Sequence, residues 1–449
     1  MTRIEEMAAF SGRVRYEDLP EDVRYKLKVC ILDALECCLS DMEDDRSLAA
    51  YRSIPKGDML AACIFGDAAR ASAEDAAFYN TVKGALTNRN DSSRTAICHP
   101  GCILVPVVLA LGEETNANGK DVLEAMLAGY ETMIRLGTTF VQAHINDSFR
   151  KTALVGAFGA AFSAARMLHL DDKGIASAAS FACHAAGGVN EWAVAGTGED
   201  VFQNGWGARN GVLSARLAAA GADGAKTILE GKNGLLAAFG ATKEEALLTD
   251  GLGTRYDILS VMHKPINCCF IVQPPSQTAK GLLDKYHLSS LSPEQVKKIT
   301  IDISRQGKEY PGCDNTKEIR SLVQGIMSIA FGVSSTLFLG SHDHINWAPP
   351  VHPEILELLH KCELRENKSM TDAFPLKMGA GVTVEMNDGT VYTNLQEDVI
   401  PLTPDEVLEK FQDTASRRLG KDRALRIHDT VMALETLSGI KTLSALLVP

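Results

Sequence analysis

Long bands of alanine, glycine and serine are the feature that most constrains how this chain can fold. They dominate residues 156–168, 175–188 and 211–221. Side chains this small let neighbouring helices approach closely and pack densely. Only 6% of the residues are aromatic, which agrees with a core built largely from small side chains. We therefore expect much of the chain from residue 1 to about 260 to form tightly packed helices.

The hydrophobic pattern changes after residue 264. From 296 to 304, isoleucines alternate with polar residues and predict a half-buried strand, preceded by a short helix that Ser292 and Pro293 would open. A second alternating segment, 382–392, contains the turn Asn387-Asp388-Gly389 and predicts a hairpin. A smaller domain of mixed helix and strand is therefore expected here.

Helix is expected again near the C-terminus and near the N-terminus. Thr403, Pro404 and two following acids are typical of a helix start. Apolar residues at helical spacing predict another helix from about 18 to 42. The fold class is thus expected to be mainly α, with a helical domain from 1–264 plus 399–449 and a smaller α+β domain at 265–398.

The composition limits the partners and the compartment. With 45 Lys and Arg against 57 Asp and Glu among 449 residues, the net charge of −12 argues against nucleic acid or an anionic membrane as the main partner. No apolar segment approaches the roughly 20 residues that span a bilayer, and the N-terminus lacks the apolar stretch of a signal peptide. Eleven cysteines without a C-x-x-C pair fit reduced thiols. We expect a soluble, cytoplasmic protein.

Metal and nucleotide cofactors are not expected. Cys98, His99, Cys102, Cys268 and Cys269 could be imagined as metal ligands, but they lack the spacing of closed metal sites. Glycine-rich nucleotide-binding fingerprints and the G-x-S-x-G nucleophile motif are also absent from the sequence. Any reaction would therefore depend on the side chains themselves.

The segment 88–109 carries the densest group of reactive side chains. It reads NRNDSSRTAICHPGCILVPVVL and joins a polar loop to an apolar helix. His99 can exchange protons near neutral pH, since an unperturbed imidazole has a pKa of about 6.5. Asp91 and Ser93 lie close enough upstream to orient or polarise it, although helix capping explains an aspartate and a serine equally well. The group of side chains together indicates a catalytic loop more strongly than any single one of them does.

Three cations elsewhere could bind carboxylates. Lys264 falls at the expected domain junction, where ligand clefts are common. Arg150 and Arg209 each border a small-residue helix, where a guanidinium could fork onto carboxylate oxygens. Ordinary surface and helix-end charges are the alternative interpretation for all three.

The order of several short motifs resembles the MmgE/PrpD family over nearly the whole chain. The motifs are His99-Pro100-Gly101, Asn118-Gly119-Lys120-Asp121, Ala128-Gly129-Tyr130-Glu131, Arg135-Leu136-Gly137, Val155-Gly156, Ala208-Arg209-Asn210-Gly211, Ile228-Leu229-Glu230-Gly231 and Lys264-Pro265. That family includes 2-methylcitrate dehydratase, cis-aconitate decarboxylase and iminodisuccinate epimerase.

The resemblance implies a helical domain, an inserted α+β domain, a homodimer and an active site between the domains. It also implies action on a small di- or tricarboxylate without metal or organic cofactor. By position, His99 and Lys264 match catalytic residues of the family, Asp91 matches one acid of its D-x-D-D-[TS] stretch, and Ser93 matches the closing hydroxyl.

The chain departs from the family at five positions. Relatives carry an acid where this chain has Arg89, a histidine where it has Arg150, a lysine where it has Asp200, a histidine or other polar group where it has Cys269, and a tyrosine near Gly325. We expect Arg89, Arg150 and Cys269, like Ser93 and Arg209, to lie in the substrate-binding region.

The leading hypothesis is a cofactor-independent lyase, a hydro-lyase that removes a proton and water from a small polycarboxylate. His99 would exchange the proton, Lys264 and Arg150 would stabilise negative charge, and Asp91 with Ser93 would orient the histidine. The alternatives are an epimerase or isomerase, a decarboxylase on a similar acid, and a non-catalytic binding protein on the same scaffold.

Overall fold

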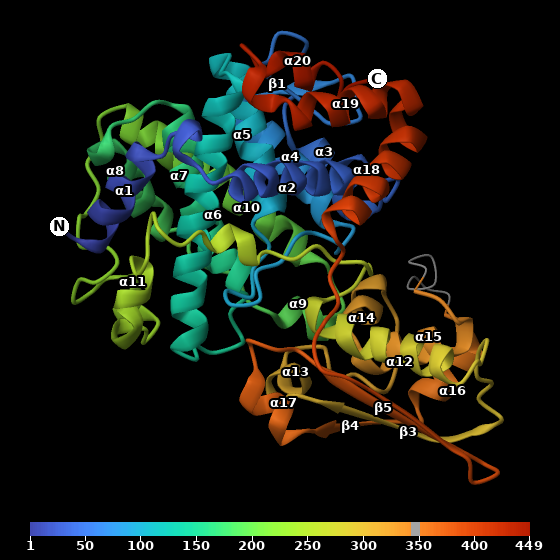
Figure 1. Ribbon diagram of the computed structural model, residues 1–449. Helices are drawn as coiled ribbons and strands as arrows, with labels where there is room; N and C mark the ends of the chain where they lie inside the picture. The colour runs from blue at the N-terminus through green and yellow to red at the C-terminus, as the bar shows by residue number, and fades with distance from the viewer. Residues whose placement is uncertain (343–350) are drawn as a thin grey trace. The chain divides into compact units, whose positions relative to one another are not determined.

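The computed structural model describes residues 1–342 and 351–449, which divide into two compact units (Figure 1). Unit 1 comprises residues 1–188, 199–263 and 402–449. Unit 2 comprises residues 189–198 and 264–401. The segment 189–198, which the sequence analysis put in the helical domain, thus groups with the smaller unit, as does Lys264.

Unit 1 is almost entirely helical, as the small-residue bands predicted. Its longer helices are α1 (Arg3–Arg13), α2 (Glu21–Leu39), α3 (Asp45–Ser53), α4 (Ala73–Ala85), α5 (Gly101–Thr115), α6 (Gly119–Gln142), α7 (Lys151–Met167), α8 (Asp172–Cys183), α10 (Glu199–Ala219), α18 (Pro404–Leu419) and α19 (Lys421–Met432). Short elements complete it: α11 (Leu235–Ala238), α20 (Lys441–Ser444), 3-10 turns at Tyr16–Asp18, Thr242–Leu248, Asp257–Ser260 and Leu434–Thr436, and the two-residue strands β1 (Ala62–Cys63) and β2 (Arg70–Ala71).

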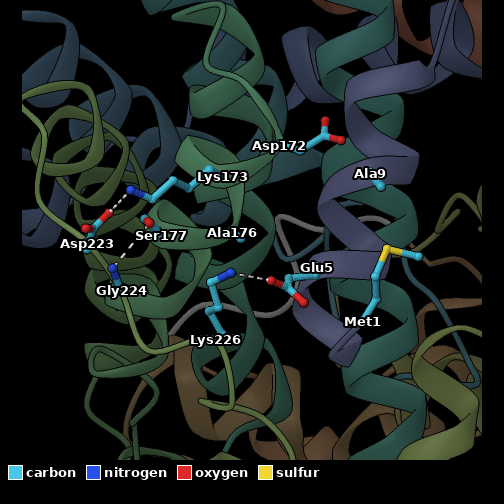
Figure 2. Close-up of a pocket in the computed structure, with 10 residues that line it drawn as sticks. All are labelled: Met1, Glu5, Ala9, Asp172, Lys173, Ala176, Ser177, Asp223, Gly224 and Lys226. Carbon is cyan, nitrogen blue, oxygen red and sulfur yellow. Dashed lines mark hydrogen bonds and ion pairs between the residues drawn. The ribbon is translucent and has the colours of Figure 1, made fainter.

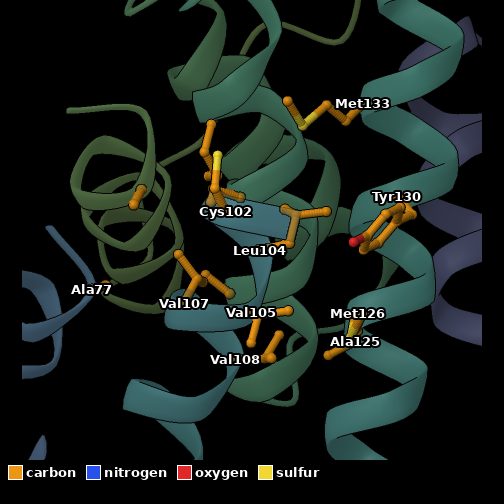
Figure 3. Close-up of a cluster of buried hydrophobic side chains, with 14 of the residues drawn as sticks. Ala77, Cys102, Leu104, Val105, Val107, Val108, Ala125, Met126, Tyr130 and Met133 are labelled. Carbon is orange, nitrogen blue, oxygen red and sulfur yellow. The ribbon is translucent and has the colours of Figure 1, made fainter. Parts of the chain in front are cut away.

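Close packing of α6, α7 and α10 explains the glycine and alanine bands. A Cβ atom added at Gly129 of α6 would lie 3.1 Å from the backbone oxygen of Gly159 on α7. A Cβ at Gly211 of α10 would lie 2.3 Å from the Cβ of Ala160 on α7. Backbones this close leave no room for larger side chains. Beside these contacts, apolar side chains of α5 and α6 fill the core (Figure 3).

No helix in the described ranges is both long enough and apolar enough to cross a membrane. The longest helix, α6, is amphipathic and carries buried charged residues such as Glu131 and Arg135. This long helix therefore lies in the interior of unit 1, where most of its side chains are buried.

Unit 2 contains a four-stranded sheet packed against helices. The strands are β3 (Val296–Ile303), β4 (Cys362–Glu366), β5 (Ala380–Met386) and β6 (Val391–Gln396), in the order β4-β3-β5-β6. β3 pairs parallel with β4, and the pairs β3–β5 and β5–β6 are antiparallel. The helical elements are α9 (Glu191–Ala195), the 3-10 turn Phe270–Val272, α12 (Gln273–Lys285), α13 (Arg305–Glu309), α14 (Leu322–Met327), α15 (Ile329–Leu339), α16 (Pro353–Leu359) and α17 (Lys368–Ala373).

Most local expectations for unit 2 are confirmed, and one is wrong. The alternating isoleucines of β3 are buried, and the hairpin turns at Gly389, whose φ of 89° suits glycine. Residues 292–295 form only a turn, with Gln295 N donating to Ser292 O at 3.1 Å. The expected short helix has no room, because the strand begins at Val296.

Candidate active site

The loop between α4 and α5 carries the candidate residues Arg89, Asp91, Ser93 and His99, and its backbone is paired at two points. Ser92 and Met262 exchange backbone hydrogen bonds of 2.8 and 2.9 Å, and Ser93 pairs with Cys98 across the loop. Ile97 has a φ of 47°, in the left-handed region that β-branched residues rarely adopt. Strain of about 1–3 kcal/mol persists only where surrounding contacts hold the backbone. The loop is therefore a firm support for the side chains it presents.

His99 lies at the end of this loop, partly exposed and with one ring nitrogen held in place. Its Nδ1 lies 3.0 Å from the backbone oxygen of Asp91 and 3.0 Å from the Oγ of Ser92. A carbonyl oxygen can only accept, so the hydrogen-bond network assigns the proton of the neutral ring to Nδ1. The basic lone pair is then on Nε2, and proton exchange can take place at that atom.

The hydroxyl that contacts the imidazole belongs to Ser92, whereas the sequence pointed to Ser93. The Oγ of Ser93 lies 3.3 Å from Oγ1 of Thr95 and accepts a hydrogen bond from the backbone N of Ala96 at 3.4 Å. Ser93 thus stabilises the turn within the loop, while Ser92 contacts the ring of His99. The bridges to Met262 and Cys98 decide which serine faces the ring, and neither bridge is visible in the sequence.

Asp91 is buried, and its carboxylate anchors the start of α5. Oδ1 accepts from the backbone N of Gly101 at 2.8 Å, and Oδ2 accepts from the Oη of Tyr130 at 2.6 Å. Its backbone N donates to Oδ2 of Asp33 at 3.1 Å. Burial and the charge of Asp33 raise the pKa of Asp91 to about 7 despite the two donors. The carboxylate fixes the segment whose backbone oxygen holds His99.

A buried ion network lies beneath the loop. Asp33 and Glu36 of α2 both face Lys410 of α18, whose Nζ lies 2.8 Å from Asp33 and 3.4 Å from Glu36. Arg89 pairs with Glu36, and Nδ1 of His263 lies 3.4 Å from Asp33. Although burial opposes ionisation, these contacts lower the pKa of Asp33 and raise that of Lys410. The guanidinium of Arg89, expected to bind substrate, is thus engaged in this network.

Arg150 connects to the His99 loop through a chain of contacts. Its Nη1 donates to the Oδ1 of Asn204 at 2.5 Å and to the backbone oxygen of Asp200 at 3.1 Å. Asn204 donates to Sγ of Cys102 at 3.7 Å, and that thiol donates to the backbone oxygen of His99 at 3.2 Å. Burial raises the pKa of Asp200, while the charge of Arg150 opposes the rise. The structure therefore brings Arg150 and His99 into one connected set.

Arg209 stands apart from this set. Its side chain is half exposed and pairs with Asp75 of α4 at 3.1 Å. Since the described contacts of Arg209 lead to α4 and not to the loop, its expected role in substrate binding stays a prediction.

Lys264 and Cys269 lie in unit 2. Lys264 is buried, and its Nζ donates to the backbone oxygen of Cys268 at 3.2 Å. Cys269 is partly exposed. The Cys313 thiol, with help from backbone N–H groups and the Lys264 charge, lowers the pKa of Cys269 to about 7 although burial opposes the shift. An ammonium and a readily ionised thiol thus lie in the same part of unit 2.

A cavity of about 360 Å³ lies elsewhere in unit 1, between α1 and α8 (Figure 2). Four of its charged groups form two ion pairs: Lys173 with Asp223 at 2.7 Å and Lys226 with Glu5 at 2.8 Å. None of the residues proposed from the sequence lines it. Among the residues the structure describes, no three His, Cys, Asp or Glu side chains gather as metal ligands would.

Sequence reasoning missed Ser92, Tyr130, Asn204 and the Asp33–Lys410 pair. Two charged residues inside the apolar pattern of α2, Asp33 and Glu36, were a usable signal, because buried carboxylates need partners. The partners themselves, far along the chain, were not foreseeable.

Comparison with known proteins places the site in a family context. Residues 5–247 match the MmgE/PrpD N-terminal domain, and residues 267–436 match the MmgE/PrpD C-terminal domain. Cis-aconitate decarboxylase of Aspergillus terreus is 24% identical, covering 98% of this chain and 95% of the relative. The cis-aconitate decarboxylase-like protein oryM of Aspergillus oryzae is also 24% identical, over 98% and 96%. Human cis-aconitate decarboxylase is 26% identical, over 83% and 79%.

Proposed function

Because the chain belongs to the MmgE/PrpD family, we propose that it is a cofactor-independent lyase acting on a small tricarboxylate. The reaction breaks a bond next to a carbon that a carboxylate activates. The observation that carries this proposal is His99, whose Nδ1 is held by Asp91 so that Nε2 is the proton-exchanging atom.

The bond broken is C–C, with loss of carbon dioxide. Support comes from the relatives: the match covers 95% of a protein named cis-aconitate decarboxylase and 96% of one named cis-aconitate decarboxylase-like protein. In this reaction a carboxylate leaves as carbon dioxide, and His99 as an imidazolium gives its Nε2 proton to the carbon that gains the electrons. Dehydration, the first expectation from the sequence, uses the same histidine to remove a proton while water leaves. The two reactions are told apart by their products.

Two buried cations supply the electrostatic part of the mechanism. Arg150 is oriented by Asn204, and we assign it to a substrate carboxylate. Lys264 is held by the backbone oxygen of Cys268 and stabilises the enolate-like charge that develops during bond breaking. Asp91 acts through His99 and is a positioning residue. Ser93, Arg89, Arg209 and Cys269 are proposed to shape the substrate region without exchanging protons.

The test is incubation with cis-aconitate, citrate and 2-methylcitrate, followed by NMR of the products and measurement of released carbon dioxide. We expect carbon dioxide and a dicarboxylate from cis-aconitate. The substitutions His99→Asn and Lys264→Ala are each expected to lower turnover by about 100-fold or more, as the loss of one well-placed group typically does.

His184→Asn is the matched control, because His184 is an exposed histidine at the end of α8. Its turnover should equal that of the unaltered protein. If His99→Asn keeps full activity, the assignment of the proton-exchanging group is wrong. If every acid binds without product, the protein is a binding protein on this scaffold.

We also propose a homodimer. One face of α10 carries three exposed apolar side chains, Trp206, Leu213 and Leu217, at seven- and four-residue spacing, and such a stripe favours a second copy as partner. Leu213→Glu should yield monomers in light-scattering measurements. Leu425→Glu, which changes a similarly exposed leucine on α19, should not.

A further inference from the structure

Another hollow of unit 1, of about 460 Å³, lies between residues 1–19 and the segment 249–256. Its apolar and aromatic lining residues are Phe10, Val14, Leu19, Leu252 and Tyr256. They come from two distant parts of the chain, and none of the described residues that line the hollow belongs to the His99 loop. A concave surface of this size, largely apolar with a few polar groups, is typical of a site for a small molecule.

Two arginines of the interior hold the walls of the hollow in place. Arg166, which pairs with Glu124 at 2.7 Å, donates to two backbone oxygens at the end of α1, at 3.2 and 3.3 Å. Arg135, which is buried, donates to two backbone oxygens of the segment 249–256, at 2.5 and 3.1 Å. The hollow is therefore preformed, and a ligand would not have to order its walls on binding.

Two exposed cations, Arg13 and Arg15, also line the hollow. Nε of Arg13 donates to the backbone oxygen of Ala9 at 2.8 Å. Nη1 of Arg15 donates to the backbone oxygens of Gly12 at 2.9 Å and Val14 at 2.7 Å. In the part of the chain that the structure describes, no other hydrogen bond or ion pair engages these two side chains. Most of their N–H groups are therefore left for a ligand.

Two acids, Glu6 and Asp18, line the same hollow. Glu6 pairs with Arg3 at 3.5 Å. Within the described chain, neither acid pairs with Arg13 or Arg15, so both arginines can bind an oxyanion, which a guanidinium does through two N–H groups at once. The two carboxylates repel further negative charge on the same ligand. The hollow is thus suited to a ligand with one anionic group.

We propose that this hollow binds a small carboxylic acid that carries one negative charge and a flat apolar body. The carboxylate accepts hydrogen bonds from Arg13 and Arg15, and the body lies against the rings of Phe10 and Tyr256. None of the residues assigned to the lyase reaction is among the described lining residues, so this ligand is additional to the substrate.

The test is isothermal titration calorimetry of the full-length protein with benzoate as the probe. One benzoate per chain is expected to bind. Three compounds are the comparison: acetate lacks the ring, benzyl alcohol lacks the charge, and isophthalate adds a second carboxylate. Each should bind at least about 10-fold more weakly than benzoate, because each loses one part of the proposed recognition or adds repulsion.

The site is assigned with variants. Arg13→Gln combined with Arg15→Gln should weaken benzoate binding by at least about 10-fold, since charge-assisted hydrogen bonds are lost. Tyr256→Ala, which keeps both arginines, should weaken it as well. Arg52→Gln is the matched control, because Arg52 is exposed and forms no ion pair in the described chain, and it should leave the affinity unchanged.

Three results would overturn the proposal. They are the absence of benzoate binding, equal binding of isophthalate, and loss of benzoate binding in Arg150→Gln, which would put the acid at the candidate active site instead. Since the titrations involve no turnover, their outcome is independent of the proposed lyase activity.

Discussion

Replacing Gly101 by alanine probes the anchor of the His99 loop at its tightest point. The new methyl group would lie 2.7 Å from the Oη of Tyr130 and 2.8 Å from Oδ2 of Asp91. These two oxygens hydrogen-bond to each other at 2.6 Å in a buried site. They cannot both retreat from the methyl group without weakening that bond or moving the helix start.

The expected effect follows from three contributions. Loss of a hydrogen bond to a charged group removes about 1.5–3 kcal/mol of stability, and overpacking a buried site removes about 1–3 kcal/mol. Alanine's better helix propensity returns up to about 1 kcal/mol. We expect Gly101→Ala to lower the free energy of unfolding by about 1.5–6 kcal/mol. Turnover should also fall, because the displaced Asp91 backbone no longer holds Nδ1 of His99.

Urea unfolding followed by circular dichroism measures this loss. The control is Gly187→Ala, because Gly187 is exposed and a Cβ there meets nothing within 4 Å. Its free energy of unfolding should stay within about 0.5 kcal/mol of the parent. Tyr130→Phe removes one of the two crowded oxygens, so it and Gly101→Ala should be less than additive when combined.

An unchanged stability in Gly101→Ala would refute the anchor geometry. Strict additivity with Tyr130→Phe would refute it as well, since two changes at one contact must couple.

Two further predictions concern the buried charges. Lys410→Met should lower the free energy of unfolding, measured by urea titration, by about 3–5 kcal/mol, because Asp33 and Glu36 lose their shared cation. Adding Asp33→Asn to this variant should restore part of the lost stability. An unchanged stability in Lys410→Met would show that the network is dispensable. The folded-state pKa of Asp91, about 7, exceeds its unfolded value, so its stabilising contribution is present at low pH and is lost as the pH rises through 7. Between about pH 5.5 and pH 8, the free energy of unfolding of the unaltered protein should therefore fall by about 2 kcal/mol relative to that of Asp91→Asn. If the stabilities of the two proteins change with pH in parallel, the raised pKa is contradicted.

The sequence predicted those parts of the fold that depend on residues close together in the chain, such as helix packing by small residues and the start of a helix. Small-residue bands predicted close helix packing, which the contacts of Gly129 with Gly159 confirm. Thr403 is the N-cap of α18, as the sequence predicted, and the structure adds a capping box with Glu406. The short helix expected at Ser292 does not form, because β3 begins at Val296 and leaves residues 292–295 room only for a turn.

The candidate site was predictable only where its residues are close in sequence. His99 and Asp91 share one loop, so their contact could be anticipated. The choice between two adjacent serines, by contrast, depended on a backbone bridge to Met262, about 170 positions away. Arg150 was expected near the site as a lone cation, and its connection to His99 through Asn204 appears only in three dimensions.

The buried ions explain why the C-terminal helices matter to a loop near residue 90. Asp33 touches both the backbone of Asp91 and the ammonium of Lys410. Glu36 pairs with both Arg89 and Lys410, so α18 is tied to the loop through two buried carboxylates. Removing one member leaves a buried charge unpaired, which is far more destabilising than removing the whole network. We therefore expect Asp33 and Lys410 to be retained or lost together in evolution. In a chain that kept Asp33 without Lys410, the loop that positions His99 would be less firmly held.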